Sequence, residues 1–130
     1  MLNAGLEFNL KFKVETYVYM GFRQIFHDNN PLHTEIEYAR KKGFKDIVMQ
    51  GNILNGFVSY FIGEGLPVKD VIIHSQQISF ISPVYLNDEL NFTAIIDEVF
   101  ESVKVVKFKF SFKNDSGKTV AKGTIQIGLT

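Results

Sequence analysis

The segment from His27 to Thr34, HDNNPLHT, holds two of the three histidines of the chain beside a carboxylate. An imidazole titrates near neutral pH and can act as a general base. A carboxyl group in an apolar pocket can hold a proton and act as an acid. Asp28 and His33 lie five residues apart across Pro31, so a corner at the proline can turn both toward one pocket. The same residue types also form ordinary turns, and this second interpretation stays open.

Composition limits where else chemistry can arise. The 130 residues are 45% hydrophobic and include 13 Phe, which predicts one globular domain over residues 1–130. No cysteine is present, so disulfides, a thiol nucleophile and thiolate metal sites are excluded. The three histidines have no spacing that supports a metal site. Acid-base chemistry must therefore come from carboxylates, histidines, hydroxyls and the backbone.

Charge and hydropathy argue against two classes of partner. The 14 basic and 14 acidic residues cancel, which is not the basic excess of a nucleic-acid surface. Among the first twenty residues, Glu7, Lys11, Lys13 and Glu15 interrupt the apolar positions, unlike a signal peptide or a membrane span. We therefore expect a cytoplasmic protein without a nucleic-acid or membrane partner.

The first half of the chain contains one strand pattern followed by several helix patterns. Apolar residues at every second position predict a strand over 6–14, and helical spacing predicts a helix over 16–26. Thr34-Glu35-Ile36-Glu37 has the form of a capping box, which predicts a helix from Thr34 to Lys42 ended by Gly43. A longer apolar segment at three- and four-residue spacing predicts a central helix from about 53 to 63.

The second half is rich in β-forming residues. Strands are expected over 71–81, 90–100 and 103–112, followed by a turn at 114–118 and a final strand to 129. An apolar sheet face needs a cover, and a helix that is apolar around most of its surface needs to be enclosed. The fold class is therefore α+β, with a curved antiparallel meander wrapped around one long helix. Open sheet edges in such a fold favour a homodimer.

The spacing of the first segment resembles a known motif. It is similar to the Asp-x-Asn-Pro-x-His pattern of the MaoC-like dehydratases, the family of the (R)-specific enoyl-CoA hydratases. The matching residues are Asp28, Asn30, Pro31 and His33. Further similarity covers nearly the whole chain: Gln50-Gly51 stands at a His-Gly or similar pair, and 80–84 with 87–90 at a Phe-x-x-Pro-Val and Gly-Asp segment. The resemblance implies a hot-dog fold, a curved antiparallel sheet around a long helix.

The resemblance also implies a reaction, the reversible hydration of a 2-enoyl thioester to an (R)-3-hydroxyacyl thioester. This reaction needs a base for water, an acid for the α-carbon and a donor for the thioester oxygen. We assign His33 as base and Asp28 as acid, although the sequence does not fix this division. The backbone N–H of Gly51, at the positive end of the central helix, is the expected oxyanion donor.

Three further residues are predicted to bind substrate: Asn30, Gln50 and Ser59. Asn30 either shapes the loop or positions water, and Ser59 either lines the site, as the resemblance implies, or packs within the helix. Coenzyme A or phosphopantetheine would arrive as part of the substrate, so we expect no separate cofactor and no metal.

One departure from the family pattern keeps other functions open. Phe26-His27 stands where the family commonly has Ser-Gly or Thr-Gly before its Asp, which places two large side chains beside the site. His27 either lies in the pocket or faces solvent. A hot-dog thioesterase and a non-catalytic acyl-thioester-binding homologue are therefore the alternatives, since a fold alone does not fix a reaction.

Overall fold

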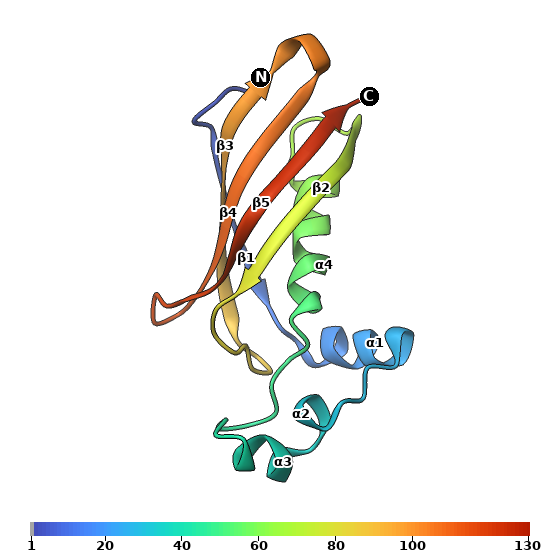
Figure 1. The fold of residues 1–130 in the computed structure, drawn as a ribbon, viewed down its shortest axis with the longest axis vertical. Helices are drawn as coiled ribbons and strands as arrows, with labels where there is room; N and C mark the ends of the chain where they lie inside the picture. The colour runs from blue at the N-terminus through green and yellow to red at the C-terminus, as the bar shows by residue number, and fades with distance from the viewer. Residues whose placement is uncertain (1) are drawn as a thin grey trace.

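The computed structural model describes residues 2–130 and contains one antiparallel sheet beside a helix (Figure 1). The strands are β1 (Glu7–Lys13), β2 (Val71–Phe80), β3 (Glu89–Phe100), β4 (Val105–Asn114) and β5 (Thr119–Leu129). Their order in the sheet is β1-β3-β4-β5-β2, and every neighbouring pair is antiparallel. The α+β class and the curved sheet are confirmed.

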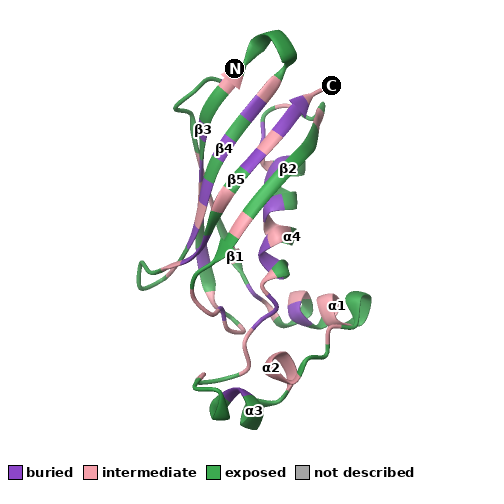
Figure 2. Ribbon diagram, viewed as in Figure 1, coloured by how far each residue is buried: buried purple, intermediate pink, exposed green. Residues whose placement is uncertain are grey.

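Helix α4 (Asn52–Tyr60) covers the inner face of the sheet and continues into the π-helical turn η1 (Phe61–Gly65). Phenylalanines fill the space between helix and sheet because alternate residues of each strand point inward. Phe108 of β4 is fully buried, and its ring centroid lies 5.6 Å from that of Phe61. Figure 2 shows this buried face of α4 and the exposed outer side of β2.

Three short helices lie beyond one end of the sheet (Figure 1). They are α1 (Thr16–Phe26), α2 (Pro31–Thr34) and α3 (Ile36–Lys41). Helix α1 has the bounds expected from the sequence. A coil from residue 42 to residue 51 then leads into α4. The site residues of this segment therefore sit between α1 and the start of α4.

The predicted capping box at Thr34 is wrong. Thr34 ends α2, and its hydroxyl donates to the carbonyls of Asn29 and Asn30 instead of capping a following helix. Helix α3 begins after Glu35, which makes no side-chain cap. The capping side chain is Asn30, whose Oδ1 accepts the Leu32 N–H at 3.0 Å. Pro31 at the first helical position favours this earlier start.

The predicted order of strands is wrong in one respect. Strand β2 does not pair with β3, which follows it along the chain, but lies at the edge beside β5. The segment from Ile81 to Asp88 carries the chain across to β3, at the far side of the sheet next to β1. Only β3, β4 and β5 form a meander. The expected start of β4 at Val103 is also two residues too early, because a 3₁₀ turn occupies Glu101–Val103 and β4 begins at Val105.

None of the helices within residues 2–130 is long and apolar enough to cross a membrane.

Candidate active site

The turn that carries Asp28 is built by local backbone geometry. His27 ends α1 in the left-handed conformation, with a φ angle of 58°. Three residues later, Asn30 caps α2, and its own backbone nitrogen lies 3.4 Å from Asp28 Oδ1. Asn30 thus shapes this turn, which is one of the two roles expected for it. His27 is exposed and does not line the cavity described below.

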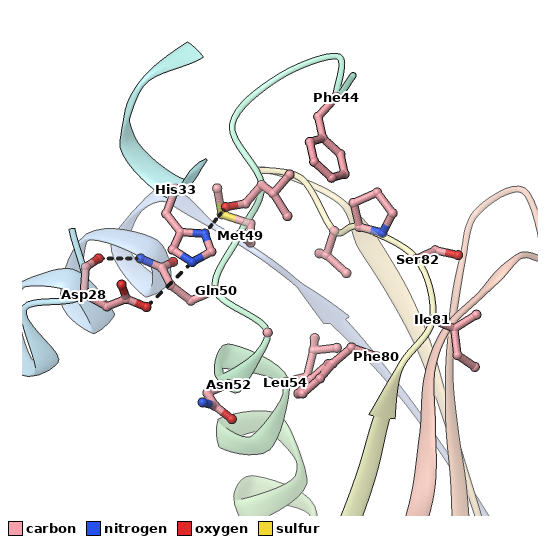
Figure 3. Close-up of a pocket in the computed structure, with 14 residues that line it drawn as sticks. Asp28, His33, Phe44, Met49, Gln50, Asn52, Leu54, Phe80, Ile81 and Ser82 are labelled. Carbon is pink, nitrogen blue, oxygen red and sulfur yellow. Dashed lines mark hydrogen bonds and ion pairs between the residues drawn. The ribbon is translucent and has the colours of Figure 1, made fainter. Parts of the chain in front are cut away.

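Asp28 and His33 face each other from the two sides of this turn (Figure 3). Asp28 Oδ2 lies 3.7 Å from His33 Nε2, and the side chains are 43% and 17% exposed. On the other side of the ring, His33 Nδ1 lies 2.7 Å from the carbonyl oxygen of Val48. Because a carbonyl only accepts, Nδ1 carries the proton in the neutral imidazole and Nε2 presents a lone pair toward Asp28.

Helix α1 holds the turn from behind. The hydroxyl of Tyr19 donates to the carbonyl oxygen of His33 at 2.5 Å. Arg23 donates through Nη1 to the Tyr19 oxygen at 3.3 Å and through Nε to Asn29 Oδ1 at 3.0 Å. These bonds tie Asn29 and His33, both on the C-terminal side of Asp28, to α1. Sequence reasoning missed this role of Tyr19 and Arg23, for which their positions on α1 give no distinguishing signal.

Gln50 connects the turn to the start of α4. Its side chain is 3% exposed, and Nε2 donates to the carbonyl oxygen of Asp28 at 3.1 Å. That carbonyl can only accept, so the amide orientation is fixed and Oε1 points away from it. Within the described part of the chain, Oε1 is buried without a hydrogen-bond partner. Gln50 therefore holds the main chain of Asp28 in place.

Gly51 lies at the N-terminus of α4. Among residues 2–130, no oxygen accepts a hydrogen bond from its N–H, which leaves a free donor at the positive end of the helix. The ring of Phe80 packs against its Cα, and a Cβ here would lie 3.0 Å from Phe80 Cε1. A side chain at residue 51 would therefore require the Phe80 ring to shift.

These groups meet in one cavity of about 460 Å³. Asp28, His33, Gln50 and Gly51 line it together with apolar side chains from the coil before α4 and from the end of β2 (Figure 3). Four of the six predicted site residues are thus brought together. Asn30 lies behind the turn, and Ser59 is exposed on α4 outside the cavity.

The site brings a carboxyl group and an imidazole close together. Within residues 2–130, no group of three or more His, Asp or Glu side chains is placed to bind a metal ion. A carboxyl group and an imidazole with a free lone pair can exchange protons with a ligand, and the Gly51 N–H can stabilise a developing negative charge.

Comparison with known proteins identifies the family of the chain. The family model described as MaoC like domain matches residues 2–116. An (R)-specific enoyl-CoA hydratase of Rhodospirillum rubrum is 29% identical over 113 residues, which are 87% of this chain and 77% of the relative. A mitochondrial 3-hydroxyacyl-[acyl-carrier-protein] dehydratase of Arabidopsis thaliana is 32% identical over 79% of this chain and 63% of its own length.

The fold is likewise shared with solved structures. An (R)-hydratase from A. caviae involved in PHA biosynthesis superposes with a TM-score of 0.90 at 23% identity. The superposition covers 99% of this chain and 98% of that structure. The family match over most of the chain is conclusive: the protein belongs to the MaoC-like family and has its hot-dog fold.

Proposed function

We propose that the protein catalyses the reversible hydration of a 2-enoyl thioester to an (R)-3-hydroxyacyl thioester, carried on coenzyme A or acyl carrier protein. The observation that carries this proposal is the pairing of Asp28 with His33 at 3.7 Å beside the free N–H of Gly51. The names of the relatives support the same reaction class. No separate cofactor is needed, because coenzyme A or phosphopantetheine enters with the substrate.

His33 is the base in this proposal. The bond from Nδ1–H to the Val48 carbonyl leaves Nε2 as the only basic nitrogen of the neutral ring. That nitrogen faces Asp28 across a gap of 3.7 Å, beside which a water molecule can bond to both groups. Nε2 removes a proton from this water as its oxygen forms the bond to the β-carbon.

Asp28 and Gly51 complete the proposed reaction. As water adds to the β-carbon, the electron pair of the double bond moves through the α-carbon to the thioester oxygen, where the Gly51 N–H stabilises it. Asp28 in its protonated form then gives its proton to the α-carbon. Transfer of the proton from His33 back to Asp28 restores the enzyme, and their separation of 3.7 Å suits exchange through a water molecule.

An assay with crotonyl-CoA tests this function against its alternatives. Loss of enoyl absorbance without release of free thiol indicates hydration, whereas free thiol indicates a thioesterase. Neither signal, together with retained binding of the thioester, indicates a non-catalytic binding protein.

We expect Asp28→Asn and His33→Ala each to lower kcat/KM for hydration by about 10²–10⁴-fold, the range for a positioned acid or base. His27→Asn is the control, because His27 is exposed outside the cavity and Asn tolerates its left-handed backbone. Hydration at the wild-type rate by both site variants would show that the assignment is wrong.

We also propose a homodimer joined through β2. Within residues 2–130, this edge strand pairs with β5 alone, so its outer N–H and C=O groups are free to pair with another strand. Ile72, Phe80 and Ile81 along this edge are 55%, 51% and 50% exposed. Two copies of β2 can pair antiparallel about a twofold axis, which would cover these groups on both chains. Light scattering should give twice the chain mass of 14.8 kDa, and a monomer at micromolar concentration would contradict the proposal.

A further inference from the structure

The densest group of positive charges in the chain lies beside one end of the cavity that contains the candidate site. Four of the 14 basic residues fall within six positions: Arg40, Lys41, Lys42 and Lys45. All four are exposed, and none of them forms a salt bridge within residues 2–130. Because the whole chain carries no net charge, this 40–45 cluster is a local feature that could attract an anion.

The turn after α3 holds two members of the cluster next to each other. The N–H of Phe44 donates to the carbonyl oxygen of Ala39 at 3.0 Å, which folds the chain back at the end of the helix. The Arg40 side chain then reaches the Lys45 backbone, with Nε 3.5 Å from the carbonyl oxygen. Lys45 Nζ lies 4.6 Å from the ring centroid of Tyr85. Arg40 and Lys45 thus form a pair of cations at a defined place.

This pair lies at the end of the cavity that is farther from Asp28. Phe44, which precedes Lys45, lines the cavity, and so does Val84, which precedes Tyr85. Figure 3 shows Phe44 on the side away from Asp28. A ligand that extends from Asp28 through the cavity and out past Phe44 would therefore meet the two cations.

The structure of a thioester sets the direction in which its carrier leaves the site. When the thioester oxygen bonds to the Gly51 N–H, the α- and β-carbons lie beside Asp28 and His33. The sulfur is bonded to the other side of the carbonyl carbon. The pantetheine arm therefore leads away from Asp28, toward the end of the cavity lined by Phe44. On either carrier this arm ends in a phosphate group, the kind of anion that a guanidinium fork and an ammonium group bind well.

We propose that Arg40 and Lys45 bind the phosphate groups of coenzyme A, and that coenzyme A rather than acyl carrier protein carries the acyl group. The inference rests on the proposed hydration and names its carrier. A carrier protein that docks by charge needs a broad basic face, about 800 Å² on each partner in a standard interface. The cluster is small, and the exposed carboxylates of Glu35, Glu37 and Asp46 surround it in sequence. Phosphate groups can contact the two cations alone.

Arg40→Gln/Lys45→Gln tests the proposal with two substrates, crotonyl-CoA and crotonyl-pantetheine, of which the second has no phosphate. Both side chains are exposed, and Gln is nearly as good a helix former as Arg, so the fold should be kept. We expect kcat/KM for crotonyl-CoA to fall by about tenfold, since an exposed ion pair contributes up to about fivefold in affinity. The loss should be in KM, and kcat/KM for crotonyl-pantetheine should be unchanged.

Lys107→Gln/Lys113→Gln is the matched control, which also removes two exposed charges. A second cavity, of about 680 Å³, adjoins Asp28 between α1 and α4. Lys107 and Lys113 lie on β4 and line neither this cavity nor that of the candidate site. The control variant should therefore keep the wild-type ratio of kcat/KM between the two substrates.

Calorimetry with butyryl-CoA and butyryl-pantetheine separates this inference from the proposed reaction. A tighter Kd for butyryl-CoA that is lost in Arg40→Gln/Lys45→Gln supports the inference even where hydration is undetected. Equal Kd values in the wild type, or a preference that survives in the variant, overturn the inference and leave the reaction standing. Faster turnover of crotonyl-[acyl carrier protein] than of crotonyl-CoA, lost in the variant, assigns the cluster to protein docking and also overturns it. Absence of both binding and hydration overturns both proposals.

Discussion

Two regions of the molecule are held together by different forces. Helix α4 and the sheet enclose a continuous apolar core in which phenylalanine rings from β1, β3, β4 and η1 contact one another. The segment 27–50, which carries most of the site, has only three buried residues, Ala39, Met49 and Gln50. Hydrogen bonds to backbone carbonyls fix it instead. The first region has few polar contacts, and the second has almost no core.

This difference suggests that stability and catalysis depend on separate parts of the chain. The free energy of unfolding should follow the apolar area buried between α4 and the sheet. The orientation of Asp28 and His33 should follow the hydrogen bonds that end on the 28–48 backbone. Substitutions in one region should therefore leave the property of the other region nearly unchanged.

The largest effect on stability is expected from Phe108→Ala. The side chain is fully buried and packs against Phe8 and Phe61, so its removal leaves a cavity in the core. We expect the free energy of unfolding to fall by about 3–5 kcal/mol, measured by urea denaturation. Since Phe108 lines neither cavity beside Asp28, kcat/KM of the folded variant should stay near that of the wild type.

Phe100→Ala is the control for this prediction. That side chain, on β3, is 39% exposed, so less apolar area is lost and the cost in stability should be less than half as large. A Phe108→Ala variant that keeps its stability but loses hydration would contradict the separation of the two regions.

Sequence patterning predicted the core region well because burial there repeats with the period of each element. Phe108, Phe110 and Phe112 alternate with charged or polar residues and are all buried, as expected. The place of β2 was not predictable in this way. Apolar alternation indicates which face of a strand is buried. Which strand lies next to it in the sheet depends on the route of the chain around α4.

The residue types of the candidate site could be predicted from the sequence, whereas the groups that hold these residues in place could not. A spaced motif predicted Asp28 and His33, and glycine at a helix start predicted Gly51, and the structure places all three around one cavity. The partner that fixes the His33 ring is the backbone carbonyl of Val48, and backbone groups leave no mark in a sequence. Ser59 was misplaced relative to the cavity because it lies seven residues, about two helical turns, beyond Asn52, which lines the cavity.

A smaller effect, confined to activity, is expected from Gln50→Leu. Leu has a similar size, so the buried position stays filled, and the unpaired Oε1 is removed at the same time as the bond to the Asp28 carbonyl. Loss of one bond and of one unpaired group should change the free energy of unfolding by less than about 1 kcal/mol. The main chain of Asp28 is then free to shift, and kcat/KM for hydration should fall by about tenfold to a hundredfold.

Gln24→Leu is the matched control, since Gln24 is exposed on α1 and outside both cavities. A role in positioning predicts that kcat falls more than KM changes, because the Asp28 carboxyl acts in the transition state. Wild-type activity in Gln50→Asn would argue against this role, because the shorter side chain should not reach the Asp28 carbonyl. If Gln50→Leu lowered the free energy of unfolding strongly as well as kcat/KM, the site segment and the core would unfold together. The contrast between the two regions would then not hold.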